Sequence, residues 1–256
     1  MASGEVAGPK AATRGPSWRM LLITSVVVLA AAVAFVVVAA RNRSSQSAAT
    51  AAGEQLRPTG IPSTVSTPLA TLMALSPVKE RPAPGFSLTD QNGRRLSLAG
   101  LKGHPVVLEF MDPHCTDICP IVSQEFVDAY HDLGPLGRKV VFVAINVNRY
   151  HASVAAVARF SAEHDLTSIP TWHFLTGPVP LLRKAWKQYG IAVQAPSPNA
   201  DIIHSSIVYF IAPNGKERYL ASPQVDHTKA GKAFLPVPQL SGWGRGIALV
   251  ARSMLS

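Results

Sequence analysis

The only two cysteines of the chain, Cys115 and Cys119, stand four residues apart between two segments of different character. An apolar run at 106–110 precedes them and is typical of a buried strand, and residues 121–133 follow with the apolar spacing of a helix. Amides and the dipole at the start of a helix stabilise a thiolate. Side chains at i and i+4 face the same way, close enough to form a disulfide or hold one metal ion. The pair predicts a redox or metal site, with two unrelated buried cysteines as the alternative.

The apolar segment Leu21–Ala40 indicates a membrane. Its length is enough to cross the hydrocarbon core as a helix and exceeds the core of a typical signal peptide. We therefore predict a cytoplasmic tail at 1–19 and a transmembrane anchor at 20–40. Basic residues flank the segment equally on both sides, so the orientation rests on the short tail before it and the long domain after it. These favour a single-pass protein of the cell membrane with its C-terminal domain on the extracytoplasmic side.

Residues 41–81 are expected to form a flexible linker, because small and polar residues and proline dominate their first half. The more apolar stretch Thr67–Val78 can dock on the domain that follows, at 82–256. The formal net charge is +9, but the basic residues are scattered and not interleaved with aromatic ones. No nucleic-acid partner is therefore expected. Attraction to anionic lipid headgroups, or a solvated basic surface, accounts for the charge.

Strand-like and helix-like segments alternate through residues 82–256. Continuous apolar runs at 106–111 and 139–147 are typical of strands buried on both faces of a sheet. Further segments are predicted from their periodicity and turns: a hairpin at 86–98, strands at 172–175, 206–212 and 217–220, and helices at 121–133, 154–164, 181–189 and 244–255. This order predicts an α/β sandwich with a central mixed β-sheet flanked by helices and ending in a hairpin.

A dithiol at the end of the first core strand of such a sheet is the arrangement of the thioredoxin fold. The segment His114–Pro120 is similar to the Cys-Pro-Asp-x-Cys-Pro motif of one branch of it, the Sco/SenC copper-chaperone family. The segment His204–Ile211 resembles the part of that family that carries its distal histidine. The hairpin from Pro84 and the strand from Trp172 also look like the family pattern, and the resemblance covers roughly Pro82–Leu220.

The resemblance implies a thioredoxin-like metallochaperone that delivers copper to the dinuclear copper site of a haem-copper (cytochrome c) oxidase. Its metal ligands would be Cys115, Cys119 and His204, and its partner the oxidase subunit that holds the copper site. Two thiolates and an imidazole are suitable ligands for copper. Thr116 stands where the family usually has proline, and Ile203 where an aspartate usually precedes the histidine. We expect a monomer and a binding protein rather than an enzyme.

Each histidine can be a metal ligand or can have another role. A lone histidine is more often structural or exposed than a ligand. For His204 the position in the chain and the resemblance together favour a ligand. His114, adjacent to Cys115, is the next candidate, and it is expected to point away from the cysteine pair or to tune its thiolate.

Glu109 lies in the middle of the most apolar strand, six residues before Cys115. Thioredoxins place a buried aspartate at this offset, where it accepts a proton for the second cysteine. A carboxyl buried beneath the thiols would have a raised pKa and could act as a general base near neutral pH. The alternative is a strand residue that faces a polar gap or an edge.

With Glu109 as base, the cysteine pair would make the protein an extracytoplasmic thiol-disulfide oxidoreductase that keeps the cysteines of the oxidase copper site reduced. This is the alternative to the chaperone function. A thiol peroxidase is less favoured, because Asp112 and Leu108 occupy positions where that motif needs other residues.

Overall fold

The computed structural model describes residues 59–222, 226–227, 233–234 and 242–255. The chain divides into two units, Met1–Leu56 and Arg57–Ser256, and the described residues all belong to the second. None of the described helices is long and apolar enough to cross a membrane. The predicted tail at 1–19 and anchor at 20–40 lie outside the described residues, so both remain predictions.

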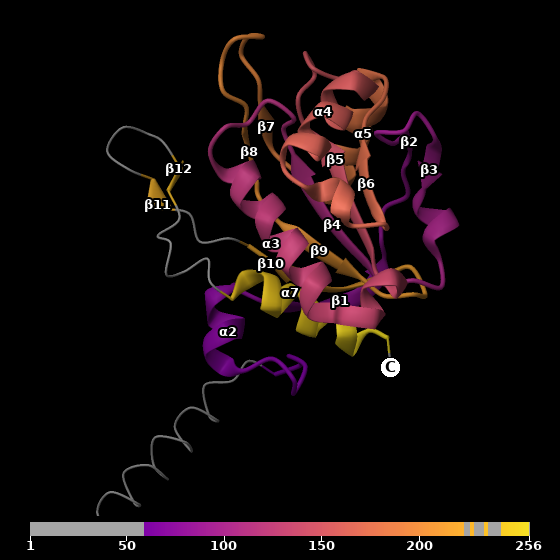
Figure 1. Cartoon of the computed structure of the whole chain (residues 1–256), viewed down its shortest axis with the longest axis vertical. Helices are drawn as coiled ribbons and strands as arrows, with labels where there is room; N and C mark the ends of the chain where they lie inside the picture. Colours follow the sequence, from indigo (N-terminus) through magenta and orange to yellow (C-terminus); the bar gives the residue numbers. More distant parts are fainter. Residues whose placement is uncertain (1–58, 223–225, 228–232, 235–241, 256) are drawn as a thin grey trace, which may run out of the picture. The chain divides into compact units, whose positions relative to one another are not determined.

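A six-stranded mixed sheet forms the centre of the second unit (Figure 1). In sheet order its strands are β1 (Ser76–Pro82), β10 (Lys216–Ala221), β9 (Val208–Ile211), β4 (Val106–Met111), β5 (Val141–Asn146) and β6 (Trp172–Leu175). The strands β4, β5 and β6 run parallel, whereas β9, β10 and β1 each run antiparallel to the strand before them. The predicted mixed sheet and its closing hairpin are confirmed.

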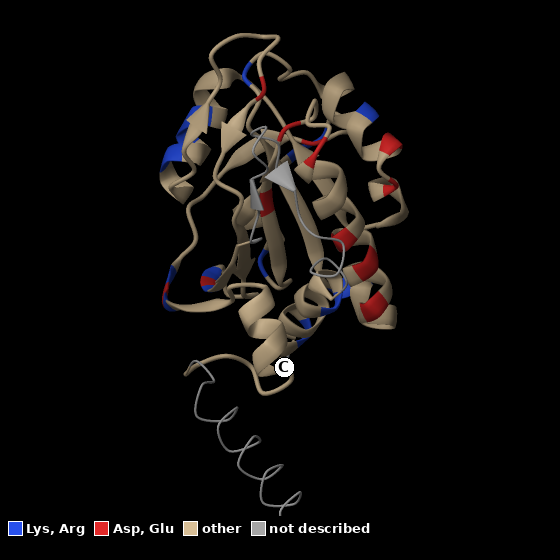
Figure 2. Cartoon of the chain, turned by 90° about the vertical axis from the view of Figure 1, so that its left-hand side faces the viewer, with Lys and Arg blue, Asp and Glu red and all other residues tan. Residues whose placement is uncertain are grey.

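Helices cover both faces of this sheet. They are α2 (Thr67–Leu72), α3 (Ile118–Leu133), α4 (Val154–Glu163), α5 (Val179–Tyr189) and α7 (Trp243–Ser253), with short 3-10 turns at Leu98–Leu101, Gly134–Lys139 and Leu166–Ser168. Side chains alternate along each strand, so β4 contributes Val107 and Met111 to a core with α3 and α7, and Leu108 and Phe110 to a core with α5. The helices differ in charge: α3 carries acidic residues and α5 basic ones (Figure 2).

The folded domain begins earlier than predicted, because the last part of the predicted linker at 41–81 is structured. It forms α2 and β1, and β1 pairs along β10 as an edge strand of the main sheet. Met73 and Leu75 are buried in the core beside α7, and the Trp243 indole donates a hydrogen bond to the Leu72 carbonyl at 3.3 Å. The linker boundary at residue 81 is therefore wrong. The composition of residues 41–81 could not show this, because Met73 and Leu75 are covered by α7, which comes from the far end of the chain.

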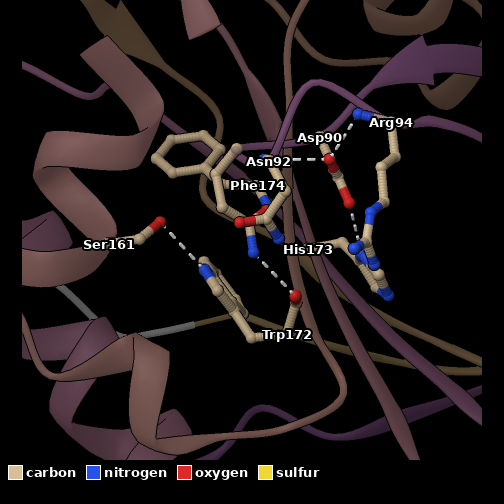
Figure 3. A network of polar contacts seen from close by, with 8 residues as sticks. Asp90, Asn92, Arg94, Ser161, Trp172, His173 and Phe174 are labelled. Carbon is tan, nitrogen blue, oxygen red and sulfur yellow. Dashed lines mark hydrogen bonds and ion pairs between the residues drawn. The ribbon is translucent and has the colours of Figure 1, made fainter. Parts of the chain in front are cut away.

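The predicted hairpin is formed by β2 (Ser87–Thr89) and β3 (Arg95–Ser97), and its turn is tied to β6 by polar contacts (Figure 3). Asp90 Oδ1 accepts hydrogen bonds from the backbone amides of Asn92 and Arg94, both at 2.9 Å. Asp90 Oδ2 lies 3.1 Å from Nδ1 of His173 in β6. His173 is thus occupied by a turn carboxylate, and this part of the family-like pattern serves the fold rather than the thiol site.

Candidate functional site

The loop from β4 to α3 is fixed by Asp112, a buried carboxylate directly after the strand. Its Oδ1 accepts hydrogen bonds from the His114 backbone amide at 2.8 Å and from the Asn148 side chain at 2.9 Å. Its carbonyl accepts one from the Cys115 amide at 3.1 Å. Because β4 and β5 are parallel neighbours, Asn148 just beyond β5 reaches Asp112 just beyond β4. The first cysteine is therefore held by its own turn and by the adjacent strand end.

The two cysteines lie at the junction of β4 and α3, as predicted: Cys115 is in the loop just before the helix and Cys119 is in its first turn. The Cys115 sulfur accepts a hydrogen bond from the Cys119 amide at 3.2 Å and donates one to Asp117 Oδ1 at 3.0 Å. Asp117 is the helix cap, since the same oxygen accepts from the Ile118 amide at 2.6 Å. Both cysteines are free thiols; Cys115 is half-buried and Cys119 is buried. Cys115 is therefore the sulfur that a partner reaches first, with Cys119 behind it.

The environment of the pair favours a proton on the inner sulfur. The pKa of the Cys119 thiol is raised well above its ordinary value by its hydrogen bond with Cys115, by burial and by the charge of Cys115. Burial also acts to raise the pKa of Asp117, but the hydrogen bonds from Cys115 and from the Ile118 amide outweigh it, and that pKa is lowered. A metal ion or a base must therefore remove the last proton from Cys119.

His204 lies in β8 (Ile203–His204), which pairs with β7 (Val193–Gln194) outside the main sheet. Its Nδ1 is 3.1 Å from the Ser205 carbonyl. A carbonyl only accepts, so Nδ1 carries the hydrogen and Nε2 keeps its lone pair. Burial lowers the pKa of His204, although the charges of Asp112 and Asp117 act in the opposite direction. The imidazole is therefore in its neutral, metal-binding form near neutral pH, and it interacts with both carboxylates that border the Cys115 loop.

The structure brings two of the three predicted ligands together. Within the described part of the chain, no group of three His, Cys, Asp or Glu side chains is arranged to hold a metal ion. Cys115 and Cys119 are in contact, whereas His204 approaches from the β7–β8 hairpin without joining them in one ligand set. Two sulfurs and a neutral imidazole nitrogen suit copper. A three-ligand copper site would require the His204 imidazole and the two sulfurs to come together.

Glu109 is buried, as predicted, and does not lie at a sheet edge, because β4 has β5 on one side and β9 on the other. The alternation of β4 puts its side chain on the same face as Val107 and Met111, which pack in one core with Cys119. The carboxyl is thus on the side of the strand that faces α3 and the inner thiol.

The contacts of Glu109 leave one oxygen unused. Ser206 donates to Glu109 Oε1 at 3.1 Å, whereas Oε2 is buried with no hydrogen-bond partner among the described residues. Burial raises the pKa of this carboxyl to about 8, because it outweighs the hydrogen bonds from Ser206 and from the Phe110 and Ile207 amides. Glu109 is therefore largely protonated at neutral pH, and its pKa is close to that of an effective general base.

Known protein families were compared with this chain, and one family matches it. The SCO1/SenC family model matches residues 76–233, which is more than half of the chain. The chain belongs to the SCO1/SenC family. Among curated SCO1/SenC relatives, the SCO1 protein homolog of Bacillus subtilis (strain 168) is 28% identical over 133 residues, 51% of this chain and 68% of that protein. The chain spans about half the length of the mitochondrial SCO2 homologues that it matches.

Solved SCO1/SenC structures share the fold. Arabidopsis thaliana ScoI with copper bound superposes with a TM-score of 0.54 at 21% identity, covering 68% of this chain and 99% of that one. BsSco, which has a disulfide switch and is a member of the Sco family of cytochrome c oxidase assembly proteins, gives a TM-score of 0.50 at 23% identity, covering 68% of this chain and 97% of that one.

This SCO1/SenC protein departs from the family pattern beside its distal histidine. Ile203 replaces the usual aspartate, and its side chain is 65% exposed. The surface next to His204 is therefore apolar where the family resemblance led us to expect an acid.

Asp112, Asn148 and Ser206 support the site but were not predicted to do so from the sequence. An Asp directly before Pro113 and His114 is typical of turns in which the Asp side chain bonds the backbone two residues on, and this signal indicates Asp112. The His114 ring stacks on His151, with centroids 3.5 Å apart. It is thus engaged by the loop after β5.

Proposed function

We propose that this SCO1/SenC protein is a membrane-anchored chaperone that binds one copper ion and delivers it to the dinuclear copper site of a haem-copper (cytochrome c) oxidase. The main support is the contact between Cys115 and Cys119 at the start of α3, where the Cys119 amide donates to the Cys115 sulfur, within a fold shared with a copper-bound relative. Cys115 and Cys119 supply two sulfur ligands and His204 Nε2 the third. The membership of BsSco in a family of cytochrome c oxidase assembly proteins supports the same destination here.

Copper binding then proceeds in a defined order. Cys115, half-buried and held by the Asp112 turn, is the first sulfur to meet the ion. Loss of the Cys119 proton provides the second thiolate, so binding releases a proton and tightens as pH rises. Closure of the β7–β8 hairpin adds His204. Two thiolates make Cu(I) the preferred oxidation state.

Segment 20–40 is the anchor in this proposal, and residues from 59 onward lie on the extracytoplasmic side. The partner is the oxidase subunit that holds the copper site, and the protein acts as a monomer. In an oxidising compartment its dithiol requires a reductant before it can take up copper.

A second candidate function is thiol-disulfide exchange, and the buried Glu109 supports it. The Cys115 thiolate attacks a partner disulfide, forms a mixed disulfide and releases one partner thiolate. Cys119 loses its proton to Glu109 and attacks the Cys115 sulfur, which releases the second partner thiolate. The partner is thereby reduced, the Cys115–Cys119 pair is oxidised to a disulfide, and an external dithiol must reduce it again.

An anaerobic Cu(I) titration of the reduced, full-length protein in nonionic detergent tests the chaperone function. We expect one copper per chain, none in the double variant Cys115→Ser/Cys119→Ser, and affinity more than tenfold lower in His204→Ala, since even groups that only orient a ligand contribute that much. His104→Ala is the matched control, because this exposed histidine precedes β4, at the end of the strand opposite the thiols. Unchanged affinity in His204→Ala would remove His204 from the site, and equal binding by the double variant would exclude the metal function.

A further inference from the structure

A hollow of about 470 Å³ lies beside the candidate site and has a cationic rim. It is lined by residues of α5, β7 and the loop after β5: Arg149, Arg183, Trp186, Lys187, Ile191, Val193 and Ala195. We call it the basic hollow. Three of its lining residues carry a positive charge and none carries a negative one, so it attracts an anionic group.

The charges of the basic hollow are not neutralised by the protein. Throughout the described ranges, none of Arg149, Arg183 and Lys187 forms an ion pair. Arg183 and Lys187 are exposed and one helical turn apart on α5, whose charged residues are all basic (Figure 2). Like charges at this spacing slightly destabilise a helix. The helix dipole favours Lys187, which lies in the last turn of α5, but it does not explain a second cation one turn earlier at Arg183. An anionic ligand would account for both.

Arg149 is held in position by neutral acceptors. Its Nη2 donates to the Ala195 carbonyl at 2.6 Å and to the Tyr150 hydroxyl. Neither acceptor cancels its charge, and the guanidinium has further N–H groups that these two bonds do not use. The side chain is thus fixed at the rim with its charge available to a ligand.

Beneath the rim the basic hollow is apolar. Trp186 is only 7% exposed, and its indole is fixed by a 2.9 Å hydrogen bond to the Asn146 carbonyl. Ile191 is also buried there. An occupant that matches this surface combines negative charge with an apolar side chain.

We propose that the basic hollow forms the docking surface for an acidic, partly apolar segment of the protein that exchanges copper or thiols with this site. The identity of that protein rests on the proposed function. Val193 of the hollow pairs with His204 across the β7–β8 hairpin, so a segment bound here lies next to the candidate ligand. A free anion would use the cations alone, whereas a polypeptide with a carboxylate beside an apolar side chain uses both the cations and the apolar floor.

The test measures fluorescence anisotropy of a rhodamine-labelled peptide that alternates Glu and Asp with Leu and Phe, added to reduced, copper-free, full-length protein in nonionic detergent. We expect saturable binding that Arg183→Gln and Lys187→Gln each weaken about three- to fivefold, as for partly exposed ion pairs. Lys184→Gln removes the same charge from the same helix outside the hollow and should change the affinity little. Ile203 lies on the face of the β7–β8 hairpin opposite Val193, so Ile203→Ser should change the affinity little. A peptide with Gln in place of the acids should not bind.

Three results would overturn the docking proposal. Equal weakening by Lys184→Gln would show general charge attraction. Full competition by millimolar inorganic phosphate would assign the hollow to small anions, and binding of phosphatidylglycerol vesicles through the same residues, without peptide binding, would assign it to a membrane surface. Copper stoichiometry, measured on the same proteins, separates the docking proposal from the chaperone function. The docking variants should still bind one copper. A wild-type protein that binds the peptide but no copper would contradict only the chaperone function.

Discussion

Ser206 donates a hydrogen bond to Glu109 Oε1 at 3.1 Å, and this contact joins the strand that leads to the thiols with the segment that follows His204. The Ser206 carbonyl accepts a second hydrogen bond, from Ser222 at 3.1 Å, so the end of β10 holds the same segment. Glu109 therefore connects β4, which leads to the two cysteines, with the segment that follows His204. It is also a buried acid on the side of β4 that faces the Cys119 thiol.

Glu109→Gln should slow disulfide reduction while leaving copper stoichiometry at one. A general base contributes roughly 10²–10⁴-fold, and glutamine retains the shape but cannot take a proton. The rate of oxidised-glutathione reduction, followed by stopped flow from about pH 6 to pH 9, should rise through about pH 8 in the wild type, where Glu109 ionises, and lose this step in the variant. Above about pH 8, where Glu109 is ionised in the wild type, copper affinity should rise slightly in the variant, because a negative charge near two thiolates is removed.

Wild-type kinetics in Glu109→Gln at every pH would leave the carboxyl with a structural role only. Loss of both copper binding and reductase activity through unfolding, detected by circular dichroism, would likewise leave the redox role without support.

The same variant should change how stability depends on pH. The pKa of Glu109 is raised from 4.5 to about 8, so between these values the folded protein holds a proton that the unfolded chain has released. The free energy of unfolding therefore falls as pH rises through this window, by on the order of a few kcal/mol. Urea denaturation at about pH 5 and pH 8 should show a smaller fall in Glu109→Gln.

A residual slope is expected in that variant, because burial also raises the pKa of Glu125, to about 7. If wild type and Glu109→Gln lose equal stability between the two pH values, Glu109 ionises near its ordinary pKa in the folded protein.

Gly244→Ala should destabilise the domain by about 1–3 kcal/mol, as overpacking of a tight contact does. Helix α7 meets α3 so closely here that an added Cβ would lie 2.8 Å from the Glu125 carbonyl and 2.8 Å from the Asp128 Cβ. Gly85→Ala is the control, since no atom lies within 4 Å of a Cβ at that position. Thermal unfolding of the two variants should separate clearly, and equal midpoints would contradict close packing of these helices.

A topology reporter tests the predicted anchor. An alkaline phosphatase fusion after Ser256 should be active, because the enzyme needs an oxidising compartment and the apolar segment Leu21–Ala40 is long enough to span a bilayer. A cytoplasmic reporter that is active at the same position would reverse the orientation. Recovery of a mature chain that begins after Ala40 would show a cleaved signal instead.

The pattern of apolar and polar residues in the sequence by itself determined those parts of the fold whose side chains are surrounded by other apolar side chains. The strand predicted at 106–111 is β4, and the one at 172–175 is β6, because a strand covered on both faces requires an apolar run. The cysteine pair, its place at the start of a helix and the burial of Glu109 also followed from spacing and context. The boundary at residue 81 did not, because β1 is an edge strand whose exposed side chains resemble those of a linker.

Only the tertiary structure decided which polar groups meet. Asp112 and Asn148 are 36 residues apart, and Glu109 and Ser206 are 97 apart, so neither contact leaves a periodic signal in the chain. Each forms because the sheet order brings β4 between β5 and β9. The basic hollow arises in the same way, since its charges come from α5 and from the loop after β5, which are far apart in the sequence and meet only in the folded domain.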